Sequence, residues 1–107
     1  EAAKTKTQHS GVDFETAAGE PVYAARSGKI VDVGQRDHLG TYVRIDHGGG
    51  LITVYGHLGA VSVAPGTCVT GGQEFAKAGQ SGVAPIPQVH FEVLREGTPV
   101  NPLDFLE

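Results

Sequence analysis

Short runs of β-branched residues, each closed by turn-forming residues, recur along the whole 107-residue chain. The chain contains 16 glycines and 6 prolines, and no helical 3.6-residue hydrophobic period persists in it. Glycine and proline favour tight turns and β-branched residues favour strands, so this pattern predicts many short strands. We expect strands at residues 11–14, 21–24, 28–34, 41–47, 51–58, 74–78 and 88–94.

The run Asp46-His47-Gly48-Gly49-Gly50 predicts a hairpin turn. Consecutive glycines adopt positive φ without steric cost, as tight hairpin turns require. Residues 41–45 and 51–55 should therefore pair as antiparallel strands. The chain is expected to be a single all-β domain over residues 1–107, an antiparallel sheet or sandwich of short strands.

Composition and charge exclude several functions. The net charge is −4 and lysines and arginines are not clustered, which argues against nucleic acid as a partner. No apolar run approaches the roughly 20 residues that a transmembrane helix needs. Residues 1–6 are polar and lack the apolar core of a signal peptide. We expect any export signal to have been removed or to lie upstream, and the chain to be the C-terminal part of a longer exported protein.

Two single residues have simple interpretations. Cys68 is the one cysteine, so an internal disulfide is impossible, and we expect it to be a small core residue.

Residues 61–76 share their spacing of glycine and proline with lipoyl and biotinyl carrier domains. A carrier needs a lysine at an exposed hairpin tip, whereas Lys77 lies inside an expected strand between two alanines. The carrier interpretation is therefore disfavoured.

Three polar signatures carry the chemistry of the chain. They are His9-Ser10-Gly11-Val12-Asp13, Tyr55-Gly56-His57-Leu58 and Gln88-Val89-His90-Phe91-Glu92. Imidazoles and a carboxylate at these spacings can converge on a zinc ion that keeps one position open to water, as a hydrolytic zinc site requires. The sequence therefore predicts a metal site built from separate strands.

Strand periodicity predicts how these side chains are oriented. Residues two or four apart in a strand share a face, which applies to His9 with Asp13 and to Gln88 with His90. By the same rule we expect Tyr55 and His57 to point together. A single histidine on an alternating strand is most often a surface residue, but three such strands in one chain make that interpretation weaker.

The other polar segments have structural interpretations. His38 lies in a polar loop and His47 at the expected hairpin turn, so both are interpreted as structural or solvent-exposed. Residues 79–87 contain no basic residue and are not a phosphate-binding loop. We expect this segment to form a rim loop beside His90.

At these residues the chain resembles the lysostaphin-type, LytM-like family of zinc endopeptidases, which cleave peptide cross-links in bacterial peptidoglycan. The resemblance runs over nearly the whole chain, through the segments His9–Phe14, Gly28–Val31, Gly40–Gly49, Tyr55–Leu58, Gly79–Glu92 and Gly97–Leu106. The helical zinc-protease signature HExxH is absent. The resemblance implies a narrow groove floored by strands, a fold related to barrel-sandwich hybrids, and a periplasmic or extracellular location.

The resemblance also implies roles for individual residues. His9, Asp13 and His90 would bind zinc, with water as the fourth ligand. His57 would be one of two catalytic histidines that do not bind the metal, and the other falls at Gln88. Glutamine cannot take up a proton at neutral pH, although its amide N–H can still donate to a developing oxyanion.

Two functions follow for such a chain. The first is a zinc-dependent peptidoglycan endopeptidase, with catalysis slowed or altered by Gln88. The second is a non-catalytic regulator that uses the same cleft to bind the cell wall or to activate another cell-wall hydrolase, an amidase. The intact metal set and His57 favour the enzyme, and Gln88 favours the regulator.

Overall fold

The computed structural model describes residues 5–7, 12–36, 39–79 and 88–100. These residues contain ten β-strands and no helix. This part of the chain accordingly contains no helix long and apolar enough to cross a membrane. The strands are β1 (Thr5–Thr7), β2 (Val12–Glu15), β3 (Pro21–Tyr23), β4 (Gly28–Arg36), β5 (Gly40–Asp46), β6 (Leu51–Val61), β7 (Cys68–Val69), β8 (Glu74–Ala78), β9 (Gln88–Arg95) and β10 (Thr98–Val100).

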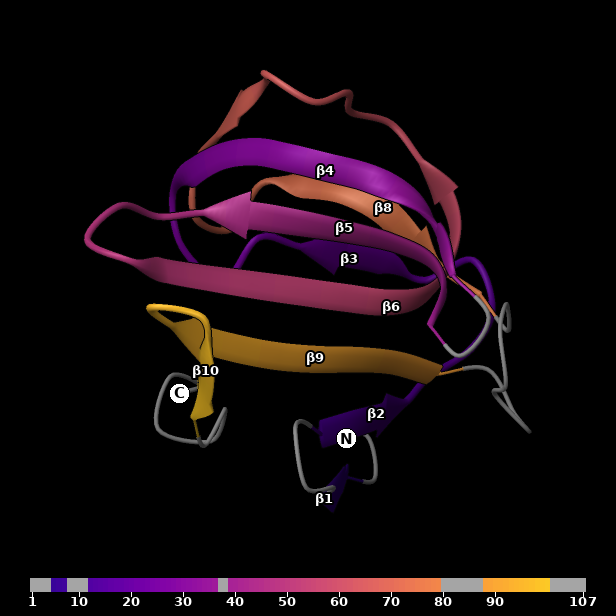
Figure 1. Ribbon diagram of the computed structural model, residues 1–107. Helices are drawn as coiled ribbons and strands as arrows, with labels where there is room; N and C mark the ends of the chain where they lie inside the picture. The colour runs from indigo at the N-terminus through magenta and orange to yellow at the C-terminus, as the bar shows by residue number, and fades with distance from the viewer. Residues whose placement is uncertain (1–4, 8–11, 37–38, 80–87, 101–107) are drawn as a thin grey trace.

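The strands form one continuous antiparallel sheet that folds back on itself. Its main path runs β1-β2-β9-β6-β5-β4-β7, with β10 added beside β9. β8 pairs with both β3 and β6, so these strands form a second layer that remains hydrogen-bonded to the first. Figure 1 shows β4, β5, β6 and β9 running side by side with β3 and β8 behind them. The predicted all-β antiparallel fold is confirmed.

Strand β6 links the two layers because it changes partner along its length. Leu51–Gly56 pairs with β9, whereas Leu58 and Val61 pair with Ala78 and Ala76 of β8. The buried apolar side chains lie between these layers. Residues with at most 2% exposure include Phe75, Ile30, Ile45, Leu58, Val43 and Val93.

Tyr55 lies at the centre of the core. Its ring makes edge contacts with Phe75, at 4.8 Å between centroids, and with Phe91, at 5.2 Å. Its hydroxyl accepts a 2.9 Å hydrogen bond from the backbone N–H of Ala25. One side chain therefore joins β6, β8, β9 and the segment after β3, combining apolar burial with a satisfied polar end.

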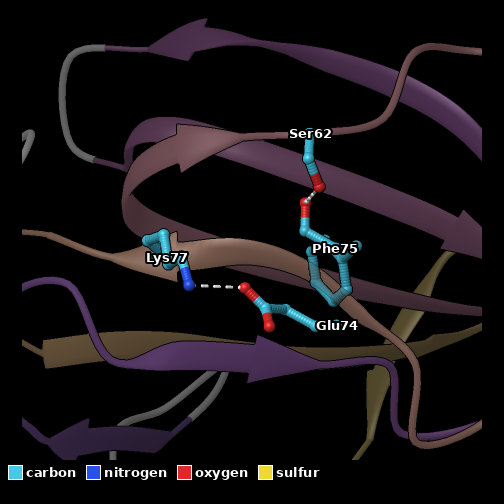
Figure 2. A network of polar contacts seen from close by, with 4 residues as sticks. All are labelled: Ser62, Glu74, Phe75 and Lys77. Atoms are coloured by element: carbon cyan, nitrogen blue, oxygen red, sulfur yellow. Dashed lines mark hydrogen bonds and ion pairs between the residues drawn. The ribbon is translucent and has the colours of Figure 1, made fainter.

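Strand β8 buries its apolar residues in the core and leaves its two charged residues exposed to solvent. Figure 2 shows Phe75 beside Glu74 and Lys77, which form an ion pair at 2.7 Å. The ion-paired side chains are 41% and 45% exposed, whereas Phe75 is fully buried. The Ser62 hydroxyl donates to the Phe75 carbonyl at 3.0 Å and joins this edge to the end of β6. Lys77 lies within a strand, as expected.

The predicted hairpin is confirmed. Val43 pairs with Tyr55, and the glycines at 48, 49 and 50 all have positive φ. His47 is structural, as predicted: its Nδ1 lies 2.8 Å from the Ser27 carbonyl and its Nε2 lies 2.8 Å from the Thr53 hydroxyl. The Ser27 carbonyl can only accept a hydrogen bond, so the His47 Nδ1–H donates to it. Nε2 of His47 then accepts a hydrogen bond from the Thr53 hydroxyl.

Cys68 is exposed, so the prediction that it is a core residue was wrong. It lies in the two-residue strand β7, where alternation gives the buried position to Val69, which is 4% exposed. The pattern analysis also missed β7 itself, together with β1 and β10. Strands of two or three residues are too short to show a period of two.

A β-bulge interrupts β6 at His57. Thr41 of β5 pairs with Leu58 and Val43 pairs with Tyr55, so β6 holds one more residue than its partner across this step. His57 takes up the extra residue with φ of 58°, in the left-handed region that non-glycine residues rarely adopt. Tyr55 faces the core, whereas the His57 ring lies next to His90. The prediction that Tyr55 and His57 point together was therefore wrong.

Burial raises the pKa of the Tyr55 phenol above its ordinary value of 10.0, and hydrogen bonds with Thr53 and Ala25 offset part of this effect. The folded state holds this proton more tightly, so stability from Tyr55 is complete below about pH 10 and is lost as the pH rises toward the folded pKa. We expect Tyr55→Phe to show a smaller alkaline loss of unfolding free energy than wild type in urea titrations. Tyr23→Phe, at a 54% exposed position, is the control and should match wild type. Equal alkaline losses in wild type and Tyr55→Phe would contradict this expectation.

The bulge predicts which substitutions at position 57 destabilise the fold most. Asparagine adopts positive φ more readily than most residues, whereas a β-branched valine is strained there. We expect His57→Val to be less stable than His57→Asn by about 1–3 kcal/mol, the usual cost of such strain. Urea unfolding of both variants measures the difference. Equal stabilities would mean that the left-handed conformation is not required.

Candidate metal centre and surrounding site

His90 lies at the centre of the candidate site because β9 is hydrogen-bonded along both edges. Its ladder partners are Asp13 in β2 and Gly56 in β6. Residues directly opposite each other on antiparallel strands share a face, with Cβ atoms about 4.5–5.5 Å apart. The register thus places an acidic residue beside His90 on one side and a residue without a side chain on the other. His90 itself is only 5% exposed.

The bulge in β6 brings a second imidazole to this face. The His57 and His90 rings lie 5.9 Å apart between centroids, at an interplanar angle of 66°. Two backbone hydrogen bonds hold the bulge: His57 N–H donates to the Leu39 carbonyl at 2.6 Å, and Gly79 N–H donates to the His57 carbonyl at 3.1 Å. His57 is 7% exposed, so little of it is accessible to solvent.

Gly79 ties β6 to the start of β9. Its carbonyl accepts a hydrogen bond from Gln88 N–H at 3.2 Å, and its N–H binds His57. A Cβ at this position would lie 2.6 Å from the backbone nitrogen of Gly59 and 2.9 Å from the carbonyl carbon of Leu58. Only glycine permits this approach, because both neighbours are backbone atoms. The positions of His57 and Gln88 are therefore set by the same residue.

Gln88 begins β9 two residues before His90 and shares its face, as the sequence predicted. It is 7% exposed, and its ladder partner in β2 is Glu15. Val89, Phe91 and Val93 occupy the opposite face and belong to the hydrophobic core or pack against it. The alternation of β9 thus separates a polar face from the apolar interior.

Glu92 is a member of the site that the sequence analysis did not assign. Its Oε2 lies 2.8 Å from Nε2 of His90, and the two side chains are 19% and 6% exposed. The signal was present in the sequence, because Glu92 is two residues from His90 and a strand has a period of two.

Some predicted residues lie outside the described part of the chain. These are His9, His38 and residues 80–87 of the expected rim loop. For Asp13 the structure gives the strand and the register. Among the side chains that the structure describes, no three His, Cys, Asp or Glu residues gather as a metal-binding group.

The residues that are placed fit a divalent cation. Asp13 is opposite His90 on the neighbouring strand, and Glu92 engages one nitrogen of the imidazole. Carboxylate and imidazole are zinc donors, and a metal-binding histidine characteristically donates its second N–H to an acceptor such as a carboxylate.

An apolar cavity of about 400 Å³ lies on the other face of the sheet. Its lining includes Tyr55 of β6 and also Val89 and Phe91, which alternate with Gln88 and His90 along β9. The cavity is therefore separated from the His90 ring by the strands themselves, and it offers no titratable group next to the imidazoles.

Comparison with known proteins identifies the fold. The model of Peptidase family M23 matches residues 7–102, most of the chain. Over 93 residues the chain is 40% identical to the peptidoglycan DD-endopeptidase ShyB of Vibrio cholerae serotype O1, covering 87% of this chain and 22% of that protein. The chain thus spans less than a quarter of this relative.

Two solved structures share the architecture. Lysostaphin from Staphylococcus simulans has a TM-score of 0.89 at 30% identity, covering 97% of this chain and 49% of that chain. A zinc-containing peptidase from Vibrio cholerae has a TM-score of 0.82 at 35% identity, covering 94% and 34% respectively. The resemblance inferred from the sequence is confirmed, and the chain belongs to peptidase family M23.

Proposed function

We propose that this chain is a zinc-dependent peptidoglycan endopeptidase domain that cleaves peptide cross-links during remodelling of the bacterial cell wall. The observation that carries the proposal is the row formed by Asp13, His90 and Gly56, with the His57 ring 5.9 Å from His90. Family membership and the names of the relatives support the same chemistry. The substrate would place the domain in the periplasm or outside the cell.

His9, Asp13 and His90 are the proposed zinc ligands. Asp13 and His90 lie opposite each other on paired strands, so a single ion can lie within reach of both residues. His9 precedes β2 by a few residues and completes the set. When bound, zinc supplies Lewis acidity for hydrolysis of a peptide carbonyl.

His57 is the proposed catalytic imidazole that does not bind the metal. Hydrogen bonds at its backbone N–H and carbonyl hold the residue in the bulge. The histidine side chain is short, so this backbone position places the ring beside His90. An imidazole in this position can move a proton to or from the reacting groups, or donate a hydrogen bond to a developing oxyanion.

Gln88 has a narrower role. Its amide can donate a hydrogen bond to an oxyanion, a contribution of about 10²–10³-fold where single donors have been removed from enzymes. It cannot accept or release a proton at neutral pH, and acid–base catalysis is worth about 10²–10⁴-fold. Proton transfer then depends on His57, and we propose that the domain is a slow endopeptidase.

The second candidate function is a non-catalytic regulator, and Gln88 is the observation that favours it. In that case the same groove would bind peptidoglycan, or would bind a cell-wall amidase and activate it. The candidate zinc ligands would then contribute to binding through the shape and charge of the groove, and they would not take part in catalysis. The Gln88→His substitution distinguishes the two functions, because it should increase cleavage by an endopeptidase and leave a regulator without cleavage.

We expect one zinc ion per chain after purification without chelators, measured by elemental analysis. His90→Ala should reduce the zinc content strongly, because it removes a proposed ligand. His57→Asn should retain zinc, because His57 is not proposed as a ligand and asparagine accepts its positive φ. A wild-type protein without zinc, even after incubation with excess metal, would reject the proposed zinc site.

We further expect Gln88→His to raise the rate of peptidoglycan hydrolysis about 10²-fold or more, since it adds a titratable group at this position. Release of cross-linked peptides from purified peptidoglycan measures the effect, with zinc content determined in the same samples. Gln88→Asn is the matched control and should show no gain, because it adds no proton acceptor. Unchanged cleavage by a zinc-loaded Gln88→His protein would favour the regulator.

A further inference from the structure

We propose, on the basis of the zinc site above, that Glu92 is the positioning residue for His90. Its carboxylate holds the Nε2–H of the imidazole, so that Nδ1 is the nitrogen presented to the metal. The contact that carries this proposal is the 2.8 Å distance between Glu92 Oε2 and His90 Nε2. Both side chains lie on the polar face of β9, opposite the core residues Val89, Phe91 and Val93.

The choice of nitrogen follows from hydrogen-bond chemistry. An ionised carboxylate can only accept hydrogen bonds, and a neutral imidazole has one N–H donor and one lone pair. The Glu92 contact therefore requires the proton of neutral His90 on Nε2 and leaves the lone pair on Nδ1. A metal ion binds the nitrogen that carries the lone pair, so Glu92 selects both the tautomer and the orientation of the ring.

The surroundings strengthen this contact. The His90 and Glu92 side chains are 6% and 19% exposed, and a charge-assisted hydrogen bond gains strength where water is largely excluded. The ion pair of Glu74 with Lys77 is the opposite case: its side chains are 41% and 45% exposed, and exposed pairs contribute little. Figure 2 shows this second pair on β8.

The difference between the two glutamates provides a matched experiment. Zinc affinity is measured by competition with a chromophoric chelator for wild type, Glu92→Gln and Glu74→Gln. The glutamine amide can either donate or accept, so it no longer enforces one tautomer of His90. We expect Glu92→Gln to weaken zinc binding by about 10–100-fold, the usual effect of removing such a partner, and Glu74→Gln to stay within about twofold. Zinc binding by Glu92→Gln within about twofold of wild type would overturn the proposal.

A measurement on zinc-free wild-type protein tests the same contact without any variant. The ¹⁵N shifts of the His90 ring, with His90→Asn used for assignment, report which nitrogen carries the proton. We expect the Nε2–H tautomer near neutral pH, and a predominant Nδ1–H tautomer would overturn the role of Glu92. Failure of wild type to bind zinc would instead reject the proposed function, so the two failures are distinguishable.

Discussion

The double pairing of β9 is the constraint on which the site depends. Antiparallel ladders fix which residues stand opposite one another, and a slip of one residue would turn every side chain to the other face. In this sheet the register brings Asp13, His90 and Gly56 into one row across three strands. Residues far apart in the chain are thus brought together by backbone hydrogen bonds, and the site inherits the rigidity of the sheet.

The same strands must also supply the core, and this requirement explains the bulge. Tyr55 and Phe91 lie on the apolar face, and in a regular strand His57 would join Tyr55 there. One extra residue in β6, at positive φ, brings the imidazole beside His90 instead. Such strain costs of order 1–3 kcal/mol and persists only where the surroundings determine it. Hydrogen bonds from His57 to Leu39 and from Gly79 to His57 provide that support.

Local signals made much of this structure predictable. The hairpin followed from glycine conformations within a few residues, and the shared face of Gln88 and His90 followed from the period of a strand. The orientation of His57 could not be obtained in this way, because the bulge depends on Leu39 and Gly79, which are remote in sequence. Exposure of Cys68 depended on which of two residues in a very short strand faces the core.

The neutral amide of Gln88 and the acidic neighbours of His90 have different consequences for the two functions proposed for this face of the sheet. Binding a cation depends on charge, and the register gives His90 an acidic neighbour across the ladder in Asp13 and another along the strand in Glu92. A largely buried carboxylate such as that of Glu92 is unfavourable unless hydrogen bonds or a cation compensate for its lost hydration. A bound divalent ion would offset this negative charge, whereas the neutral Gln88 neither adds to it nor reduces it. The zinc site that we propose therefore does not depend on a titratable group at position 88, and the slow catalysis that we propose is compatible with zinc binding.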